Sequence, residues 1–151
     1  MSKRPKHAWT SCLILRAETA SDLMSTNPLS IHADAPVEEA AAFFVEKGIS
    51  GAPVIDAAGR PIGVVSQLDL LVHNREKSTL NAVPARTRVR DVMTPFVFTV
   101  AADALAGTVV DDLLGRKIHR LFVVDNHGVL IGVISALEVL RHLRYMEPAA
   151  V

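Results

Sequence analysis

Apolar and polar positions follow one another in short runs that predict modest strands and helices. Residues 28–34 (PLSIHAD), 52–56 (APVID) and 61–65 (PIGVV) are apolar runs next to turn residues, and each predicts a strand. Over 37–45, apolar side chains recur at helical spacing, so this segment predicts a helix with one buried face. Gly48 is the expected stop of that helix.

Polar residues at the ends of these runs predict where the helices begin. Asp34 is expected to cap the first helix, whose first turn holds Pro36 and two glutamates. Ser66 is expected to cap a second helix that runs through Leu68 and Leu71. The resulting order is strand, helix, strand, strand, helix.

The same order recurs when the chain is displaced against itself by 69 residues. Residues 22–71 then lie over 91–140 without a gap, and most apolar positions meet another apolar residue. Identical pairs include Asp22/Asp91, Met24/Met93, Gly63/Gly132 and Ser66/Ser135. One unit of about 50 residues is too small to cover both faces of a sheet. We therefore predict an α+β fold of two pseudo-symmetric β-α-β-β-α repeats packed as an intramolecular pair.

The second repeat carries its own local signals. Asp103 is expected to cap a helix, and residues 121–134 predict a hairpin around the turn-rich tripeptide at 126–128. Ser135 is expected to cap a last helix that ends near Met146. The sequence therefore predicts an N-terminal tail at 1–19, a first repeat at 20–73, a linker at 74–88, a second repeat at 89–145 and a C-terminal tail at 146–151.

Composition narrows the class of protein. Half of the 151 residues are hydrophobic and 21% are charged, which excludes wholesale disorder. The formal net charge of zero argues against a nucleic-acid partner, although the tail and the linker are both basic. One cysteine excludes an internal disulfide, and no apolar run is long enough for a signal peptide or a membrane span. We expect a cytoplasmic protein without a membrane partner.

Catalytic and metal-binding signatures are missing from the sequence. It holds no HExxH, GxSxG, Walker-type or GxGxxG motif, and its six histidines lack metal-ligand spacing. We therefore expect neither an enzyme nor a metal site.

The strongest polar signal is GVVSQLD, residues 63–69. Gly63 permits a close backbone approach, and Ser66 opens a helix whose free amides can hold an anion. Asp69, one turn on, can accept two hydrogen bonds from a diol such as ribose. The alternative is a capping box, in which Ser66 and Asp69 serve the helix alone; Ser135 and Glu138 match that box fully.

The second polar signal is KIHRLFVVD, residues 117–125. Arg120 offers a forked, permanently charged donor suited to phosphate, and His119 adds a donor whose charge depends on pH. A solvated basic strand entrance is the alternative. The equivalent residues of the first repeat are Ser50 and Gly51, so two clefts between the repeats cannot be chemically equal.

These features together resemble the tandem CBS domain, the paired module named after cystathionine β-synthase. The resemblance rests on GISGAPVIDAAGRPIGVVSQLDLL, on KIHRLFVVDNHGVLIGVISALEVL, and on the DLMS and DVMT segments that precede them. It implies clefts between the repeats that bind AMP, ADP, ATP or S-adenosylmethionine. It also implies that the aspartate of G-h-h-[ST]-x-x-D holds the ribose, and that a His-Arg pair, found in some members, holds phosphate.

On that resemblance, one good cleft and one weaker cleft are expected. The good cleft would comprise Val64, Ser66, Asp69, Phe98, Ile118, His119 and Arg120, with Val64, Phe98 and Ile118 enclosing the adenine. The weaker cleft would comprise Leu29, Ile49, Ser50, Ser135 and Glu138. There Glu138 replaces the ribose aspartate, and Ser50-Gly51 replaces His-Arg.

The leading hypothesis is a regulatory module that senses adenosine nucleotides. Because the pair and its tails occupy the whole chain, its output would pass through another protein or through a change of shape. A ligand-free scaffold, S-adenosylmethionine binding and nucleic-acid binding are the alternatives. The final helix of each repeat carries more apolar surface than one pair covers, so we also expect a homodimer.

Overall fold

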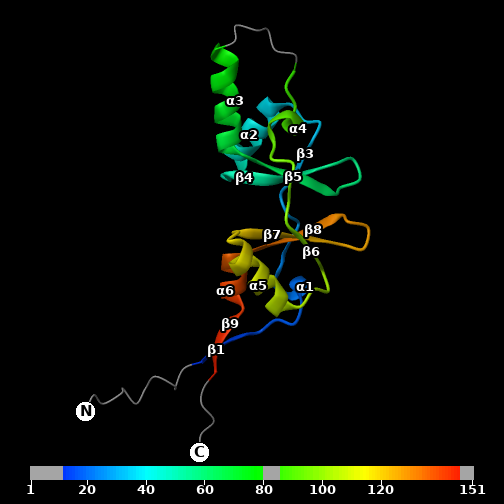
Figure 1. Ribbon diagram of the computed structural model, residues 1–151, viewed down its shortest axis with the longest axis vertical. Coiled ribbons are helices and arrows are strands. Elements are labelled where there is room, and N and C mark those ends of the chain that lie inside the picture. Colours follow the sequence, from blue (N-terminus) through cyan, green and yellow to red (C-terminus); the bar gives the residue numbers. More distant parts are fainter. Residues whose placement is uncertain (1–11, 80–85, 147–151) are drawn as a thin grey trace, which may run out of the picture.

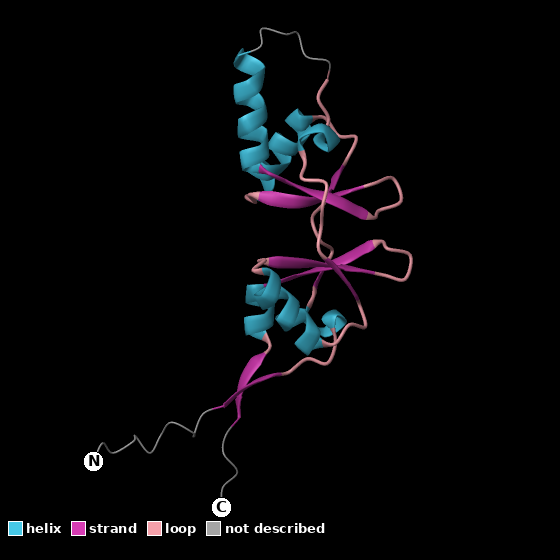
Figure 2. Cartoon of the chain, viewed as in Figure 1, coloured by secondary structure: helices cyan, strands magenta, loops and turns pink. Residues whose placement is uncertain are grey.

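A computed structural model describes residues 12–79 and 86–146 (Figure 1). Two β-sheets face each other in the middle of an elongated molecule, and helices cover their outer faces (Figure 2). The predicted α+β pair of repeats is confirmed.

The first repeat forms the predicted β-α-β-β-α unit. Its elements are β3 (Ile31–His32), α2 (Val37–Lys47), β4 (Gly51–Ile55), β5 (Pro61–Ser66) and α3 (Gln67–Thr79). The sheet order is β3-β4-β5, with β3 parallel to β4 and β5 antiparallel to it. Its core includes Ala40, Phe44, Val54 and Val65, all nearly inaccessible to solvent.

The second repeat has the same order of elements. They are β6 (Thr99–Ala101), α5 (Ala106–Arg116), β7 (Arg120–Val124), β8 (Leu130–Ser135) and α6 (Ala136–Arg141). This sheet gains a fourth strand, β2 (Ser25–Thr26), which pairs antiparallel with β8 from the far side. Its core includes Val109, Leu121, Val123 and Ile134.

Each repeat is preceded by a segment that packs on the other repeat. In α1 (Ala20–Leu23), Ala20 and Leu23 are fully buried in the core of the second repeat. In α4 (Val89–Val92), Val89 is buried in the core of the first. The two repeats are therefore interlocked by segments that cross between them in both directions.

This crossing explains the repeated glycines. A Cβ placed on Gly63 would lie 2.6 Å from the Thr94 carbonyl oxygen and 2.7 Å from the Met93 sulfur. Gly132 faces Met24 in the same way. The close backbone approach predicted at Gly63 is thus made by the crossing segment, because Val64 and Thr94 exchange both backbone hydrogen bonds, at 3.0 and 2.8 Å.

Both predicted aspartate caps are wrong. The helices begin after Pro36 and Leu105, and neither residue makes a side-chain cap. Asp34 instead accepts hydrogen bonds from Arg90, at 2.6 and 2.9 Å, and from Arg88, at 3.3 Å. Asp34 and Asp103 each lie two residues before the N-cap residue, too early to cap the helix.

At the other end of the first helix the prediction is confirmed. Gly48 closes α2 in the left-handed conformation, with φ at 64°, which glycine adopts without strain.

The last helix is shorter than predicted. It ends at Arg141, and β9 (Leu143–Met146) follows and pairs antiparallel with β1 (Cys12–Leu15). The strand ladder satisfies backbone groups that a longer helix would have paired internally. Part of the predicted N-terminal tail is therefore ordered in a two-stranded ribbon, while the boundaries assigned to tails, repeats and linker stay predictions.

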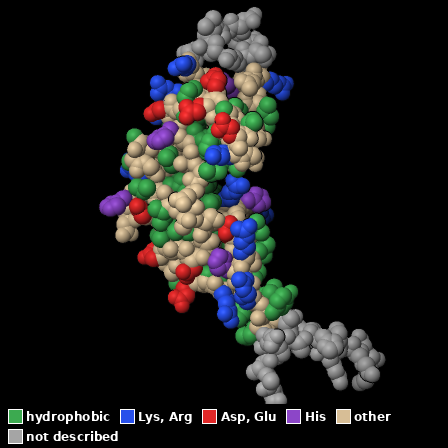
Figure 3. Space-filling view, turned by 180° about the vertical axis from the view of Figure 1, so that it is seen from behind, with side chains coloured by type: hydrophobic (Ala, Val, Ile, Leu, Met, Phe, Trp, Pro, Cys, Tyr) green, Lys and Arg blue, Asp and Glu red, His purple; other side chains and the backbone are tan. Residues whose placement is uncertain are grey.

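Charges are mixed over the surface. On the face seen from behind, basic side chains follow one flank of the second repeat, and acidic side chains lie on both halves (Figure 3). Among the described residues, every helix is too short or too polar to serve as a membrane span.

Candidate functional site

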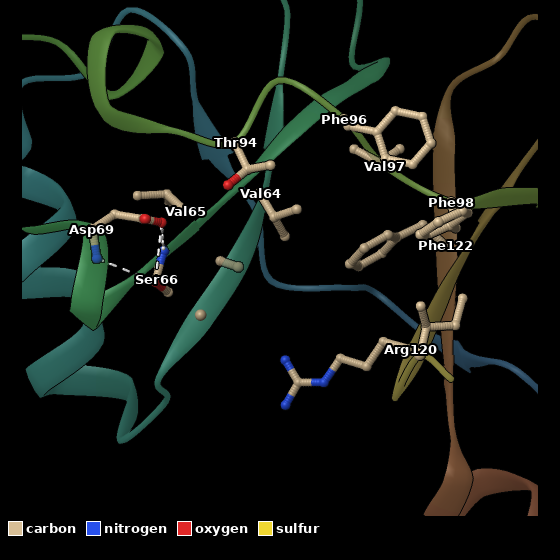
Figure 4. A pocket seen from close by; sticks show the side chains of 13 residues that line it. Val64, Val65, Ser66, Asp69, Thr94, Phe96, Val97, Phe98, Arg120 and Phe122 are labelled. Carbon is tan, nitrogen blue, oxygen red and sulfur yellow. Dashed lines mark hydrogen bonds between the residues drawn. The ribbon is translucent and has the colours of Figure 1, made fainter. Parts of the chain in front are cut away.

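Two cavities lie between the repeats, with volumes of about 380 and 300 Å³. The first cleft, the larger cavity, is bounded by β5, the start of α3 and Thr94 on one side and by Phe98 and β7 on the other, and the chain between Thr94 and Phe98 joins the two sides (Figure 4). Its lining residues are Gly51, Ala52, Val64, Val65, Ser66, Asp69, Thr94, Phe96, Val97, Phe98, Ile118, Arg120 and Phe122.

Six of the seven residues predicted for this cleft lie at it. Val64, Ser66 and Asp69 come from the first repeat, and Phe98, Ile118 and Arg120 come from the second. His119 is exposed and is not part of the lining. The fold thus brings together side chains that are far apart in the sequence; that they bind a ligand stays a prediction.

The wall contributed by the second repeat is aromatic. Phe96 and Phe98 pack edge to face, with ring centroids 4.7 Å apart and planes at 88°. Phe122 joins them on the same wall, and Val64 lies opposite (Figure 4). Sequence reasoning missed Phe96 and Phe122, although the alternation in PFVF at 95–98 puts Phe96 and Phe98 on one side of an extended chain. Together these side chains form an apolar slot.

Ser66 and Asp69 form the complete capping box that was the alternative reading of this motif. Asp69 Oδ2 accepts hydrogen bonds from the Ser66 amide at 2.8 Å and from Ser66 Oγ at 3.0 Å. Ser66 Oγ accepts in turn from the Asp69 amide at 3.3 Å. Asp69 Oδ1 receives no hydrogen bond from any described residue. The cap therefore engages one carboxylate oxygen of a residue that lines the cleft, and the other oxygen has no donor among the described residues.

Arg120 begins β7, and its side chain extends into the space between the two sheets (Figure 4). Its guanidinium makes no ion pair or side-chain hydrogen bond with a described residue. Several other arginines are engaged, since Arg60, Arg116 and Arg141 each pair with an acid on their own element or turn. Arg120 thus offers an unused, permanently charged fork at the cleft.

The second cleft is the smaller cavity, and like the first it is lined by residues of both repeats. Its lining residues are Ser25, Thr26, Asn27, Pro28, Leu29, Ile49, Gly51, Pro53, Arg120, Phe122, Val133, Ser135 and Glu138. Four of the five residues predicted for it, Leu29, Ile49, Ser135 and Glu138, are present. Ser50 is not part of the lining.

The capping box of the second cleft is only half formed. Ser135 Oγ accepts from the Glu138 amide at 3.3 Å, as the predicted cap requires. The Glu138 carboxylate, however, accepts from Arg141 at 3.3 Å, and its side chain is only 17% exposed. Thus the aspartate motif, not the glutamate motif, forms the full box, and one oxygen of the Glu138 carboxylate, Oε1, pairs with Arg141.

Several carboxylates with a lowered pKa lie in the hairpin turns or beside a crossing segment, where they accept hydrogen bonds. A hydrogen bond from the Arg60 amide lowers the pKa of Asp56, and one from the Val129 amide lowers that of Asp125. The hydrogen bond from Arg90 lowers the pKa of Asp34. None of these three acids lines either cleft. Within the described segments, no three or more metal-ligating side chains gather into a metal site.

The chain belongs to the CBS domain family. Residues 20–75 and 89–145 each match the family, and together they take up most of the chain. It is thus a protein with a pair of CBS domains, as the repeated motifs had indicated.

Solved structures of CBS pairs share this architecture. A crystal structure of CBSX2 in complex with AMP is 34% identical, with a TM-score of 0.69 over 83% of this chain and 95% of that one. CBSX2 from Arabidopsis thaliana is 31% identical, with a TM-score of 0.68 over 83% of this chain and 93% of that one.

Two curated relatives that the chain resembles are much longer proteins. The 5'-AMP-activated protein kinase subunit gamma-3 of Bos taurus is 31% identical over 78% of this chain. An inosine-5'-monophosphate dehydrogenase of Nitrosopumilus maritimus is 26% identical over 87% of this chain. The chain spans about a quarter of the length of each. The match to the dehydrogenase therefore falls on its CBS part and carries no catalytic activity over to this chain.

Proposed function

We propose that the chain is a regulatory module that binds an adenosine nucleotide in its first cleft. The observation that carries the proposal is the meeting of three features there: an apolar slot, a carboxylate oxygen without a donor, and an unpaired arginine. The AMP complex of CBSX2 and the similarity to the kinase gamma-3 subunits support an adenine nucleotide as the ligand. AMP, ADP and ATP are the candidates, and S-adenosylmethionine is the alternative.

The base fits the apolar slot. Val64 faces Phe98 and Ile118 across the cleft, so a planar adenine would be enclosed between side chains of the two repeats. Phe96 adds to the rim, where 58% of its surface is exposed. A ligand that covers Phe96 would gain from burying an aromatic ring that is otherwise in water.

The ribose and the phosphate of the nucleotide would lie at the polar end of the first cleft, near Asp69 and Arg120. Asp69 Oδ1 has no donor among the described residues and would accept from the ribose hydroxyls while Oδ2 keeps its bonds to Ser66, so capping would not prevent binding. Arg120 would donate a forked pair of hydrogen bonds to the phosphate. His119 precedes Arg120 and is exposed, so its predicted contact requires the phosphate to extend toward the rim.

Isothermal titration of the full chain against AMP, ADP, ATP, adenosine and S-adenosylmethionine tests this proposal. We expect at least one phosphorylated adenine ligand to bind more tightly than adenosine. No binding by any of the five would refute the proposal and would leave the ligand-free scaffold, which the complete capping box supports.

The proposal includes a homodimer that forms through α3 and α6, the final helices of the two repeats. Leu68 and Leu71 of α3 are 67% and 65% exposed, and Leu137 and Leu140 of α6 are 55% and 59% exposed. These are equivalent positions of the two repeats, 69 residues apart. One continuous interface could therefore use both helices, and a second copy would cover it.

Light scattering of the purified chain tests the dimer. We expect a dimer at tens of micromolar, and Leu71→Glu or Leu140→Glu should shift it toward monomer, since a charge would be buried against apolar side chains. Val45→Glu is the matched control, because Val45 is 82% exposed and belongs to α2, not to either final helix. A stable wild-type monomer would refute the homodimer.

A further inference from the structure

Three residues line both clefts: Gly51, Arg120 and Phe122. Gly51 and Arg120 are equivalent positions of the two repeats, 69 residues apart. Arg120 is the strand partner of Ser135, and Gly51 is the strand partner of Ser66. Each therefore stands opposite the serine that opens the final helix of its own repeat. These two positions mark the place where the clefts adjoin.

Only one of the two positions carries a side chain. Arg120 supplies a guanidinium, whereas Gly51 supplies nothing beyond backbone. The expectation that the second cleft lacks the arginine needs revision in this respect, because Arg120 lies at that cleft too. A single cation is shared where two pseudo-symmetric clefts would each use one.

We propose that Arg120 couples the two clefts, because its one guanidinium can hold the phosphate of a ligand in either cleft but not in both. A phosphorylated ligand in one cleft then weakens phosphate binding in the other, and a ligand without phosphate causes no such effect. The coupling rests on the function proposed above and adds negative cooperativity to it. Repulsion between two phosphates at adjoining clefts acts in the same direction.

Each cleft can be blocked separately to test this coupling. Val64 lines the first cleft and Val133 is its equivalent in the second, so Val64→Trp and Val133→Trp form a matched pair. Titration with AMP and with adenosine then reports on one open cleft at a time. The same titrations with Arg120→Ala added show whether that cleft uses the arginine.

The expected result is that AMP binding depends on Arg120 in both blocked chains, by about tenfold or more, as loss of a charged hydrogen bond predicts. Adenosine binding should not depend on it. In the wild-type chain, the second AMP should bind at least about tenfold more weakly than AMP binds to Val64→Trp. If Arg120→Ala has no effect in the Val64→Trp chain, the arginine serves the first cleft alone and the coupling is refuted.

A second variant keeps the proposal testable if the tryptophans disturb the fold. A Cβ on Gly51 would meet the Val65 carbonyl oxygen at 3.4 Å and Ser66 at 3.9 Å, which are ordinary contacts. Gly51→Arg would therefore supply the missing second guanidinium. We expect it to tighten the second AMP by about tenfold without changing adenosine; two AMP molecules that already bind independently in the wild type would overturn the coupling.

The outcomes separate this proposal from the one on which it rests. Binding of AMP to both clefts without mutual influence refutes the coupling and leaves nucleotide binding intact. If adenosine and AMP each fill one cleft only, the second cleft holds no ligand and the coupling is likewise refuted. Absence of binding by wild-type and variant chains refutes both.

Discussion

The two clefts occupy equivalent places and differ in what their carboxylates do. In the first, Asp69 lines the cavity and completes a capping box with Ser66 through one of its oxygens. In the second, Glu138 is one methylene longer and pairs with Arg141, one turn along the same helix. The position equivalent to Arg141 in the first repeat is Val72, which offers no charge.

The difference teaches that two neighbouring substitutions decide which group the carboxylate of each cleft bonds to. A shorter acid without a cation nearby gives one oxygen to the serine of its own cap. A longer acid with an arginine three residues on gives one oxygen to that arginine instead. The walls also differ, because Phe96 and Phe98 of the first cleft correspond to Asn27 and Leu29 of the second, whereas Phe122 lines both clefts. We therefore expect the first cleft to bind an adenosine ligand more tightly.

The largest expected effect comes from Arg120→Ala. It should weaken AMP binding by about tenfold to a hundredfold, because a charge-assisted hydrogen bond contributes roughly 1.5–3 kcal/mol. Adenosine has no phosphate to lose and should bind almost unchanged. Arg120→Lys should restore only part, since an ammonium lacks the planar fork. Calorimetric titration with both ligands checks this, and equal losses for AMP and adenosine would place Arg120 outside the phosphate site.

Next in size is the comparison of the two carboxylates. Asp69→Asn retains an oxygen for the cap but removes the charge, so adenosine binding should weaken by about tenfold. Glu138→Gln is the matched variant of the second cleft and should have a smaller effect on the tighter site. Titration with adenosine, together with thermal melts to confirm that both variants fold, measures the difference. Equal losses would show that the ranking of the clefts is wrong.

His119→Ala should have a smaller effect than either change. His119 lies outside the lining of both clefts, so its contribution is limited to a phosphate that reaches the rim. We expect AMP affinity to fall by less than tenfold, and a wild-type affinity that rises as the pH falls, because imidazolium is the better partner of phosphate. Titrations from pH 8 to pH 6 on wild type and variant test both; a flat wild-type profile would contradict a phosphate contact by His119.

The smallest expected effect is on stability, and it comes from the aspartates that face the two crossing segments. Asp34 pairs with Arg88 and Arg90, whereas its equivalent, Asp103, faces the positions of Thr19 and Ser21. The hydrogen bond from Arg90 lowers the pKa of Asp34, so its contribution to stability is present above the unfolded value of about 3.9. That contribution is lost as the pH falls through the lower, folded pKa.

Urea unfolding of Asp34→Asn and Asp103→Asn measures this difference. At pH 7 we expect the Asp34 variant to lose more stability than the Asp103 variant. The excess should shrink as the pH is brought below about 3.9. An excess that stays constant with pH would show that the ion pairs do not contribute. The arginine pairs are exposed, so the effect is small even at pH 7.

Much of the fold could be predicted from the sequence because the signals are local. The spacing of apolar residues over 37–45 determines a helical face, and Gly48 ends that helix by its own conformational freedom. The 69-residue displacement establishes two units, and their small size requires that they pair. Ser66 and Asp69 form a capping box within four residues, so their contact could also be predicted from the sequence.

Only the tertiary structure decided where the segments between these units go. The sequence predicted that Asp34 caps a helix, but in the fold it accepts hydrogen bonds from Arg90. The sequence also predicted helix up to Met146, but Leu143–Met146 is a strand that pairs with Cys12–Leu15. Arg120 belonged to one cleft in the sequence and lies at both in the fold. The physical reason is shared by all three: local spacing specifies which face of an element is buried, but contacts across dozens of residues depend on how two pseudo-symmetric halves pack.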